Sequence, residues 1–113
     1  MPRDYKLYLE DILAAIERIN SYTRSVDFKT FQNDSQKVDA VLHNLEVIGE
    51  AAKNVPMDLR TAYPDIEWRK IAGLRDIIVH EYFGVSVEIV WDIIQNKLPD
   101  LHKGVKEILE KAG

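Results

Sequence analysis

The stretch VDAVLHNLEVIGEAAKNV, residues 38–55, decides the fold class of the chain. Its apolar side chains recur at spacings of three and four residues, the period of one face of an α-helix; they are Val38, Val41, Leu45, Ile48, Ala52 and Val55. Asp34 or Ser35 suits the N-cap, because its side-chain oxygen can accept a hydrogen bond from the first turn. Pro56 ends the pattern, since proline lacks the N–H that a helix interior needs. We expect one long helix here.

The same period recurs on both sides of this helix. Before it, the pattern runs from Asp4 to about Arg24, with Tyr5, Tyr8, Ile12, Ile16 and Ile19 as its apolar members. After it, the pattern runs from Glu67 until Gly84 closes it, with Trp68, Ile71, Leu74 and Ile78 as its apolar members. Each segment is long enough to form an amphipathic helix.

Shorter elements complete the chain. Ser86 is a suitable cap for a helix over VEIVWDIIQNKL, residues 87–98, and Pro99 fits the first turn of a last helix. Residues 25–35 and 56–66 lack the helical period and are predicted as connectors, the second with room for a short helical turn. The sequence therefore predicts an all-α, up-and-down bundle of four to five helices that forms a single domain over residues 1–113.

The composition is that of a globular protein with one core. Of the 113 residues, 46% are apolar and 30% are charged, and there is no cysteine to form a disulfide or a thiolate metal site. No apolar run reaches the roughly 18 residues of a membrane helix, and the start, MPRDYK, lacks the apolar core of a signal peptide. We expect a cytoplasmic protein without membrane attachment. The net charge of −4 argues against general nucleic-acid coating, which depends on Lys and Arg.

The segment GLRDIIVHEYFG, residues 73–84, places polar side chains inside an apolar run. On an ideal helix Arg75 and His80 lie about 140° apart, and Tyr82 lies about 160° from His80 in the other direction. If these residues cooperate, either the helix is irregular or two copies of the segment meet across a symmetric dimer. Asp76 and His80 are four residues apart and can touch, so the carboxylate could fix the imidazole tautomer.

Each of these residues also has an ordinary structural interpretation. Arg75 could pair with Asp76, Asp65 or Glu67, His80 could be a core or interface histidine with one hydrogen bond, and Tyr82 could be a half-buried aromatic whose hydroxyl reaches water. Taken singly, these interpretations describe the commoner case.

The order Arg75, His80, Tyr82 resembles the R-x-x-x-x-H-x-Y signature of HepT-like toxins, members of the HEPN superfamily. The likeness extends through NLEVIGEAAKNVP (44–56), YPDIEWRKIAGLRDIIVHEYFGV (63–85) and VWDIIQNKLPDL (90–101), in the family's order and spacing. It therefore covers most of the chain.

The resemblance implies a HEPN-type helical bundle that forms a homodimer, with Arg75 and His80 of both subunits lining a shared cleft that cleaves RNA without a metal or other cofactor. It implies a partner as well. Such toxins are encoded beside a minimal nucleotidyltransferase antitoxin of the MntA type, which transfers AMP from ATP onto the signature tyrosine, here Tyr82. The chain is then expected to be the toxin of a type VII-like HEPN/MNT toxin–antitoxin pair.

The residue types suit this chemistry. Metal-free RNA cleavage needs a base for the 2′-hydroxyl, an acid for the 5′-oxygen and a cation at the phosphate. His80 from each subunit could supply the base and the acid, Arg75 could bind phosphate oxygens, and the product is expected to be a 2′,3′-cyclic phosphate. Nucleotides on Tyr82 would add bulk and negative charge at the cleft. Asp76 departs from the family, which often has asparagine there; we expect it to orient His80.

A second polar pattern lies on the helix of residues 38–55. Asp39, His43, Glu46 and Glu50 follow spacings of four, three and four, so they form one stripe opposite the apolar stripe. A metal site is one interpretation, but a single His-x-x-Glu copy on one helix favours a solvated charged face. A third interpretation places this face at the dimer cleft, with Glu46 or Glu50 near His80.

A function of a different class is also compatible with the sequence. HEPN domains beside nucleotidyltransferases include non-catalytic helical modules that bind the partner enzyme and assist it, and Arg75 and His80 would then be binding groups. RNA cleavage that disappears in a histidine variant separates the two functions.

Overall fold

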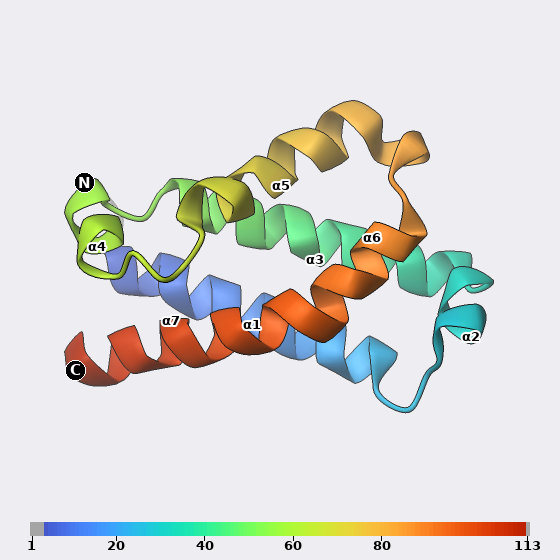
Figure 1. The fold of residues 1–113 in the computed structure, drawn as a ribbon, viewed down its shortest axis with the longest axis horizontal. Helices are drawn as coiled ribbons and strands as arrows, with labels where there is room; N and C mark the ends of the chain where they lie inside the picture. The colour runs from blue at the N-terminus through green and yellow to red at the C-terminus, as the bar shows by residue number, and fades with distance from the viewer. Residues whose placement is uncertain (1–3, 113) are drawn as a thin grey trace.

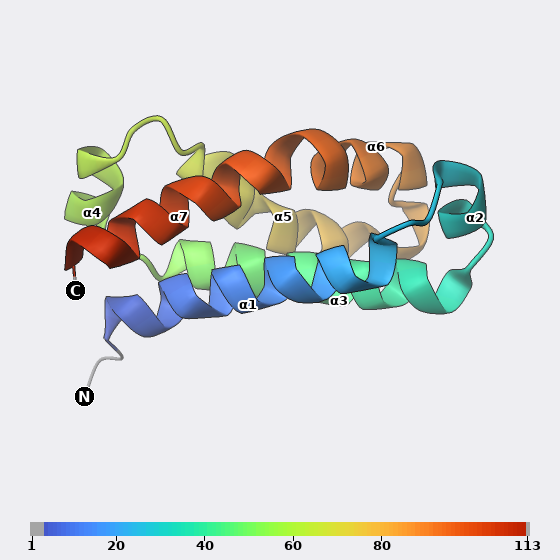
Figure 2. The ribbon, with the colours of Figure 1, turned by 90° about the horizontal axis from the view of Figure 1, so that it is seen from below.

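The computed structural model describes residues 4–112 (Figure 1). The elements, in order, are α1 (Tyr5–Thr23), α2 (Phe28–Gln32), α3 (Ser35–Lys53), α4 (Met57–Ala62), α5 (Trp68–Glu81), the 3₁₀ turn η1 (Tyr82–Gly84), α6 (Val87–Asp92), the π-helical turn η2 (Ile93–Lys97) and α7 (Leu98–Ala112). Four long units, α1, α3, α5 and α6–η2–α7, run alternately up and down the bundle (Figures 1 and 2). The predicted all-α bundle is confirmed, and residues 4–112 contain no strand.

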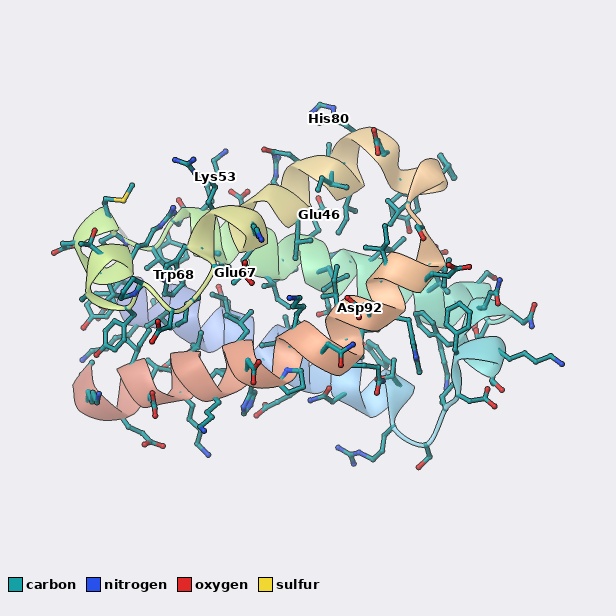
Figure 3. All side chains as sticks on the ribbon, in the orientation of Figure 1. Glu46, Lys53, Glu67, Trp68, His80 and Asp92 are labelled. Atoms are coloured by element: carbon teal, nitrogen blue, oxygen red, sulfur yellow. The ribbon has the colours of Figure 1, made fainter. Side chains whose placement is uncertain are left out.

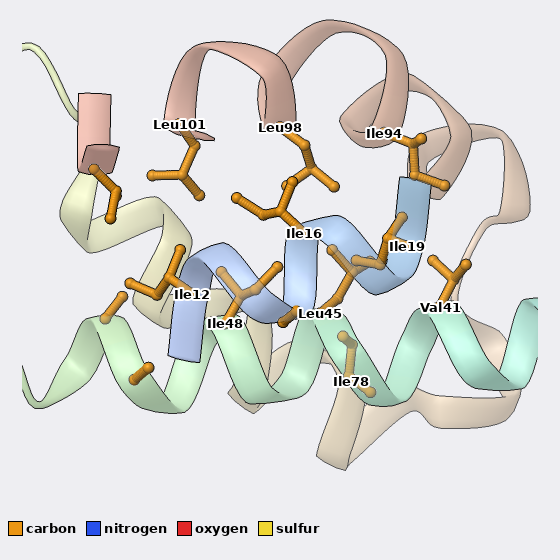
Figure 4. Close-up of a cluster of buried hydrophobic side chains, with 14 of the residues drawn as sticks. Ile12, Ile16, Ile19, Val41, Leu45, Ile48, Ile78, Ile94, Leu98 and Leu101 are labelled. Atoms are coloured by element: carbon orange, nitrogen blue, oxygen red, sulfur yellow. The ribbon is translucent and has the colours of Figure 1, made fainter. Parts of the chain in front are cut away.

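The core forms where α1, α3 and α7 face one another, with α5 packed on the other side of α3 (Figure 4). Of the apolar residues that the helical period predicts to be buried, Ile12, Ile16, Ile19, Val41, Leu45, Ile48 and Ile78 are almost fully buried there, whereas Tyr5, Tyr8, Val38, Ile71 and Leu74 are only partly buried. Ile94, Leu98 and Leu101 complete this core. Helix α5 is the least embedded of the long helices, because only Trp68 and Ile78 of its residues are buried. Most of the surface of α5 therefore stays available for other contacts.

Both ends of α3 are fixed by hydrogen bonds. Asp34 is the N-cap, and its Oδ1 accepts a hydrogen bond from the N–H of Lys37 at 3.1 Å. At the other end the helix stops at Lys53, and the guanidinium of Arg60 in α4 donates to the carbonyls of Ala52, Lys53 and Val55 at 2.7 to 3.0 Å. Side chains that bind the free carbonyls of a helix end stabilise it, so α4 serves as the C-terminal cap of α3.

One predicted connector contains a helix instead. Residues 28–32 form α2, whose N-cap is Asp27, with Oδ1 accepting from the N–H of Thr30 at 2.8 Å. Phe31 is fully buried and its ring lies 5.1 Å from that of Trp91. A single buried aromatic on a five-residue helix leaves no periodic pattern in the sequence, which is why the period missed this element.

The predicted break before Pro99 is also absent, because the chain passes from α6 to α7 through the π-helical turn η2. The ring of a proline inside a helix clashes with the carbonyl four residues earlier and supplies no N–H to it. In η2 the N–H of Leu98 donates to the carbonyl of Ile93, five residues earlier, which widens the helix just before the proline. The last two predicted helices are therefore one continuous unit.

Gly49 sets the distance between α3 and α5. A Cβ atom at this position would lie 2.6 Å from the backbone nitrogen of Arg75, 2.9 Å from the Cβ of Arg75 and 3.1 Å from the carbonyl oxygen of Ile71. All three are backbone or backbone-attached atoms of α5 and cannot move aside alone. Only glycine at position 49 allows this close approach.

We predict that Gly49→Ala destabilises the fold by about 1–3 kcal/mol, because α5 must shift away from α3 and the loss outweighs the higher helix propensity of alanine. Thermal unfolding followed by circular dichroism measures the change. Gly73→Ala in α5 is the matched control, since a Cβ there meets nothing within 4 Å, and it should be neutral or stabilising. Equal unfolding temperatures for the two variants would contradict the close-approach explanation.

Candidate functional site

Arg75 lies on α5 and turns its guanidinium toward α3. Its Nε lies 3.1 Å from Oε2 of Glu50, and its Nη1 lies 3.3 Å from Oδ1 of Asp76. Its third nitrogen, Nη2, has no hydrogen-bond partner within residues 4–112. The ion pair with Asp76 was one of the interpretations open from the sequence, whereas the pair with Glu50 places Arg75 against the acidic stripe of α3. Two carboxylates hold the cation in place and leave one edge of it open.

Asp76 contacts Arg75 in this structure and not His80. The Asp76–His80 hydrogen bond expected from their spacing is absent from the described residues, although the two side chains are four positions apart. The carboxylate is 59% exposed, so it can still change partners. Its pairing with Arg75, which also pairs with Glu50, offsets part of the negative charge that would otherwise repel a phosphate group.

His80 points away from the bundle. Figure 3 shows its side chain on the outer side of α5, facing away from α3 and Glu46, and it is exposed. No hydrogen bond or ion pair engages it within the part of the chain that the structure describes. Because α5 is a regular α-helix from Trp68 to Glu81, Arg75 and His80 do not share a face of it. One chain alone therefore does not bring the two groups together.

Large apolar side chains are exposed around His80. Ile77 is 53% exposed, Val79 47% and Phe83 100%, and all three lie within three residues of the histidine. They account for half of the large apolar side chains exposed in the described residues. Exposed apolar groups gathered around a polar side chain mark a surface that suits a protein contact.

Tyr82 lies where α5 gives way to the 3₁₀ turn η1, and its side chain returns to α3. Its hydroxyl donates a hydrogen bond to Oδ1 of Asp39 at 2.9 Å. Partial burial raises the pKa of the phenol above its usual value, and the carboxylates of Asp39 and Glu46 raise the pKa further. Tyr82 is therefore a neutral phenol, held by a carboxylate, at neutral pH.

The acidic stripe of α3, formed by Asp39, His43, Glu46 and Glu50, interacts with α5 and the turn that follows it, while Asp39, His43 and Glu50 stay exposed to solvent. Asp39 binds Tyr82 at one end of the stripe and Glu50 binds Arg75 at the other. Glu46 acts on the pKa of Tyr82, so three of the four stripe residues interact with the segment that contains the motif. The sequence showed the stripe but not its partners, because pairing between helices depends on their packing.

The residues of this site lie within a region that matches a known protein family. The profile of the family described as "Ribonuclease HepT-like" matches residues 12–108, which include Arg75, His80 and Tyr82. The chain belongs to the HepT-like ribonuclease family. The predicted family membership is thereby confirmed.

Relatives from several organisms match over almost the whole chain. The protein named "Probable ribonuclease HepT" from Thermococcus cleftensis is 45% identical over 111 residues, covering 98% of this chain and 100% of that protein. "Putative RNase MJ0127" from Methanocaldococcus jannaschii is 42% identical over 111 residues, covering 97% and 92%. "Putative RNase TTE0752" from Caldanaerobacter subterraneus subsp. tengcongensis is 42% identical over 104 residues, covering 92% and 93%. No solved structure matches the chain.

A shallow hollow of about 330 Å³ lies beside Arg75 in this HepT-like fold. Polar side chains from two helices line much of it: Tyr8 and Asp11 from α1, and His43, Glu46 and Glu50 from α3.

Within residues 4–112 no three or more His, Cys, Asp or Glu side chains are grouped so that they could hold a metal ion. None of the helices in this range combines the length and the apolar character that a membrane span needs. His102 lies elsewhere, with Nε2 3.7 Å from Oε1 of Glu17.

We predict that Tyr82 titrates above the ordinary tyrosine pKa of about 10 and that Asp39→Asn lowers its pKa, because the variant removes one of the charges that oppose ionisation. Titration of the tyrosine ¹³Cζ signals by NMR, assigned with Tyr82→Phe, measures both values. Since the folded state disfavours the phenolate, stability is unaffected below about pH 10 and falls as the pH rises through the raised pKa. An unchanged pKa in the variant would mean that the hydrogen bond does not persist in solution.

Proposed function

We propose that this HepT-like protein is a homodimeric, metal-independent endoribonuclease that acts as the toxin of a toxin–antitoxin pair. Its active site is the cleft where two copies of α5 meet, and His80 and Arg75 are its catalytic residues. A partner nucleotidyltransferase of the MntA type silences it by transferring AMP from ATP to Tyr82. The names of its relatives, which describe RNases, support the ribonuclease part of this proposal.

The position of His80 is the observation that carries the proposal. The histidine is exposed, has no hydrogen-bond or ion-pair partner among the described residues, and lies within three positions of the exposed Ile77, Val79 and Phe83 in the sequence. A histidine needed only for structure would be expected to use its ring nitrogens in a hydrogen bond. Burying these apolar side chains against a second copy would stabilise a dimer and would bring the two His80 side chains into one cleft.

A pair of histidines can then carry the proton transfers. One imidazole takes the proton from the 2′-hydroxyl as its oxygen attacks phosphorus, and the other gives a proton to the departing 5′-oxygen, which leaves a 2′,3′-cyclic phosphate. The free Nη2 edge of Arg75 can bind a phosphate oxygen and balance the charge of the transition state. Glu50 and Asp76 limit the rotation of the guanidinium, so less freedom is lost when RNA binds.

Each catalytic residue can be tested with purified protein and RNA in EDTA. We expect His80→Ala to lower the cleavage rate by about 100-fold to 10,000-fold, the usual contribution of a general acid or base. Arg75→Ala should lower the rate by a similar factor and Arg75→Lys by less, because lysine keeps the charge but loses the planar fork. Cleaved fragments should end in a cyclic phosphate, which mass spectrometry detects.

Circular dichroism and sedimentation of the same variants check that the fold and assembly are intact. Cleavage that persists in the His80→Ala variant would exclude this active site. If the wild-type protein leaves RNA uncut while binding the nucleotidyltransferase, the protein is a helical partner module and not a nuclease.

We predict that Ile77→Asp converts the dimer to a monomer and abolishes RNA cleavage, because a charge is then buried in the contact between the two α5 helices. Sedimentation equilibrium over a range of concentrations measures the assembly. Met57→Ser is the matched control, since Met57 is 70% exposed but lies on α4, at the opposite end of α5 from Phe83 (Figure 1). A dimer that survives Ile77→Asp and dissociates with Met57→Ser would place the interface on the other end of the bundle.

A further inference from the structure

The hydrogen bond between Tyr82 and Asp39 joins two residues that are 43 positions apart in the sequence. The proposed mechanism of RNA cleavage does not use it. The phenolic oxygen donates its proton to Oδ1 of Asp39 at 2.9 Å. Asp39 is an exposed residue of the second turn of α3 and makes no other hydrogen bond or ion pair within residues 4–112. The carboxylate of Asp39 therefore has one interaction among the described residues, a hydrogen bond with the hydroxyl of Tyr82. This hydroxyl is the proposed acceptor of the nucleotide.

A phenol in this position is a poor nucleophile unless something removes its proton. Burial and the charges of Asp39 and Glu46 raise the pKa of Tyr82, so the phenolate is scarce at neutral pH. A weak nucleophile is commonly activated by a general base within hydrogen-bond reach. Asp39 is the side chain whose oxygen already accepts the hydrogen bond from the phenolic hydroxyl of Tyr82.

We propose that Asp39 is the general base for nucleotide transfer to Tyr82, supplied by the acceptor protein itself. The inference rests on the proposed role of Tyr82 as the nucleotide acceptor. As the phenolic oxygen forms a bond to the α-phosphorus of ATP, the bond from that phosphorus to the β-phosphate oxygen breaks. The proton passes to Oδ1 of Asp39, and the electron pair of the broken bond leaves with pyrophosphate.

The transfer of the proton from Tyr82 to Asp39 becomes favourable during the reaction, although a carboxylate is a weak base. In the free protein the phenol is the much weaker acid, so the proton stays on Tyr82. The acidity of the phenolic oxygen rises as its bond to phosphorus forms, and the proton then moves to the carboxylate late in the step. An amide at position 39 could still accept the hydrogen bond and position the ring, but it could not take the proton.

Formation of the product breaks the contact. The esterified oxygen of Tyr82 has no proton to donate, and the attached phosphate brings a negative charge next to Asp39 and Glu46. Repulsion of like charges moves the modified side chain away from α3. The same carboxylate thus assists the transfer and discourages the modified tyrosine from returning to its original position.

The test is the rate of the first nucleotide transfer, measured by intact mass with the purified protein, its cognate nucleotidyltransferase, ATP and Mg²⁺. Asp39→Asn should slow the transfer by about 100-fold or more, the range for loss of a general base. Asp39→Glu, which keeps a carboxylate, should recover part of the rate. Asp100→Asn on α7 is the matched control and should react as the wild type does, because it changes the net charge equally without contacting Tyr82.

The pH dependence separates a base from a residue that only positions the ring. With Asn at position 39 the reaction depends on the phenolate, so the ratio of wild-type to variant rates should fall as the pH rises toward the tyrosine pKa. A constant ratio, or an Asp39→Asn rate equal to that of Asp100→Asn, would overturn the role of Asp39 while leaving Tyr82 as the acceptor. If wild type and Tyr82→Phe gain the same mass, or neither gains any, the acceptor role fails and Asp39 with it.

Discussion

The close contact of α3 with α5 at Gly49 is the constraint on which the rest of the site depends. With no Cβ at position 49, the backbone of α5 at Arg75 comes within van der Waals distance of α3. Glu50 is the next residue on α3, and it pairs with the guanidinium of Arg75. Gly49 sets the distance between α3 and α5, and Glu50 orients the guanidinium of Arg75. Two consecutive residues of α3 therefore determine the position of Arg75.

Helix α3 supplies carboxylates to the motif in antiparallel order. Arg75 of α5 pairs with Glu50 near the C-terminal end of α3, and Tyr82, just after α5, pairs with Asp39 near the N-terminal end of α3. The two carboxylates that contact Arg75, Glu50 and Asp76, together outweigh its single positive charge. The part of the site that can attract a phosphate oxygen is therefore the Nη2 edge of the guanidinium, which neither carboxylate occupies.

The sequence predicts the long helices well, because each buries one apolar face in the core. The helical period predicts α1, α3 and α5, and residue type predicts the caps: Asp34 or Ser35 for α3, of which Asp34 is the cap, and Ser86 for α6. The short helix α2 was missed, since one buried aromatic, Phe31, leaves no period, and the π-helical turn before Pro99 was read as a break. Interactions between helices, such as Tyr82 with Asp39, depend on the packing angle and were not predictable from spacing within one helix.

The change from α-helix to 3₁₀ turn at Tyr82 separates two tasks. Up to Glu81, α5 is regular and presents His80 to the outside, where a second copy can meet it. At Tyr82 the chain tightens into η1, and the tyrosine turns back to Asp39 on α3. The proposed nucleotide acceptor and the proposed catalytic histidine thus lie two residues apart in sequence and have different surroundings. In this proposal Asp39, which His80 does not contact, activates Tyr82, while charge added at Tyr82 still acts over the short distance to His80.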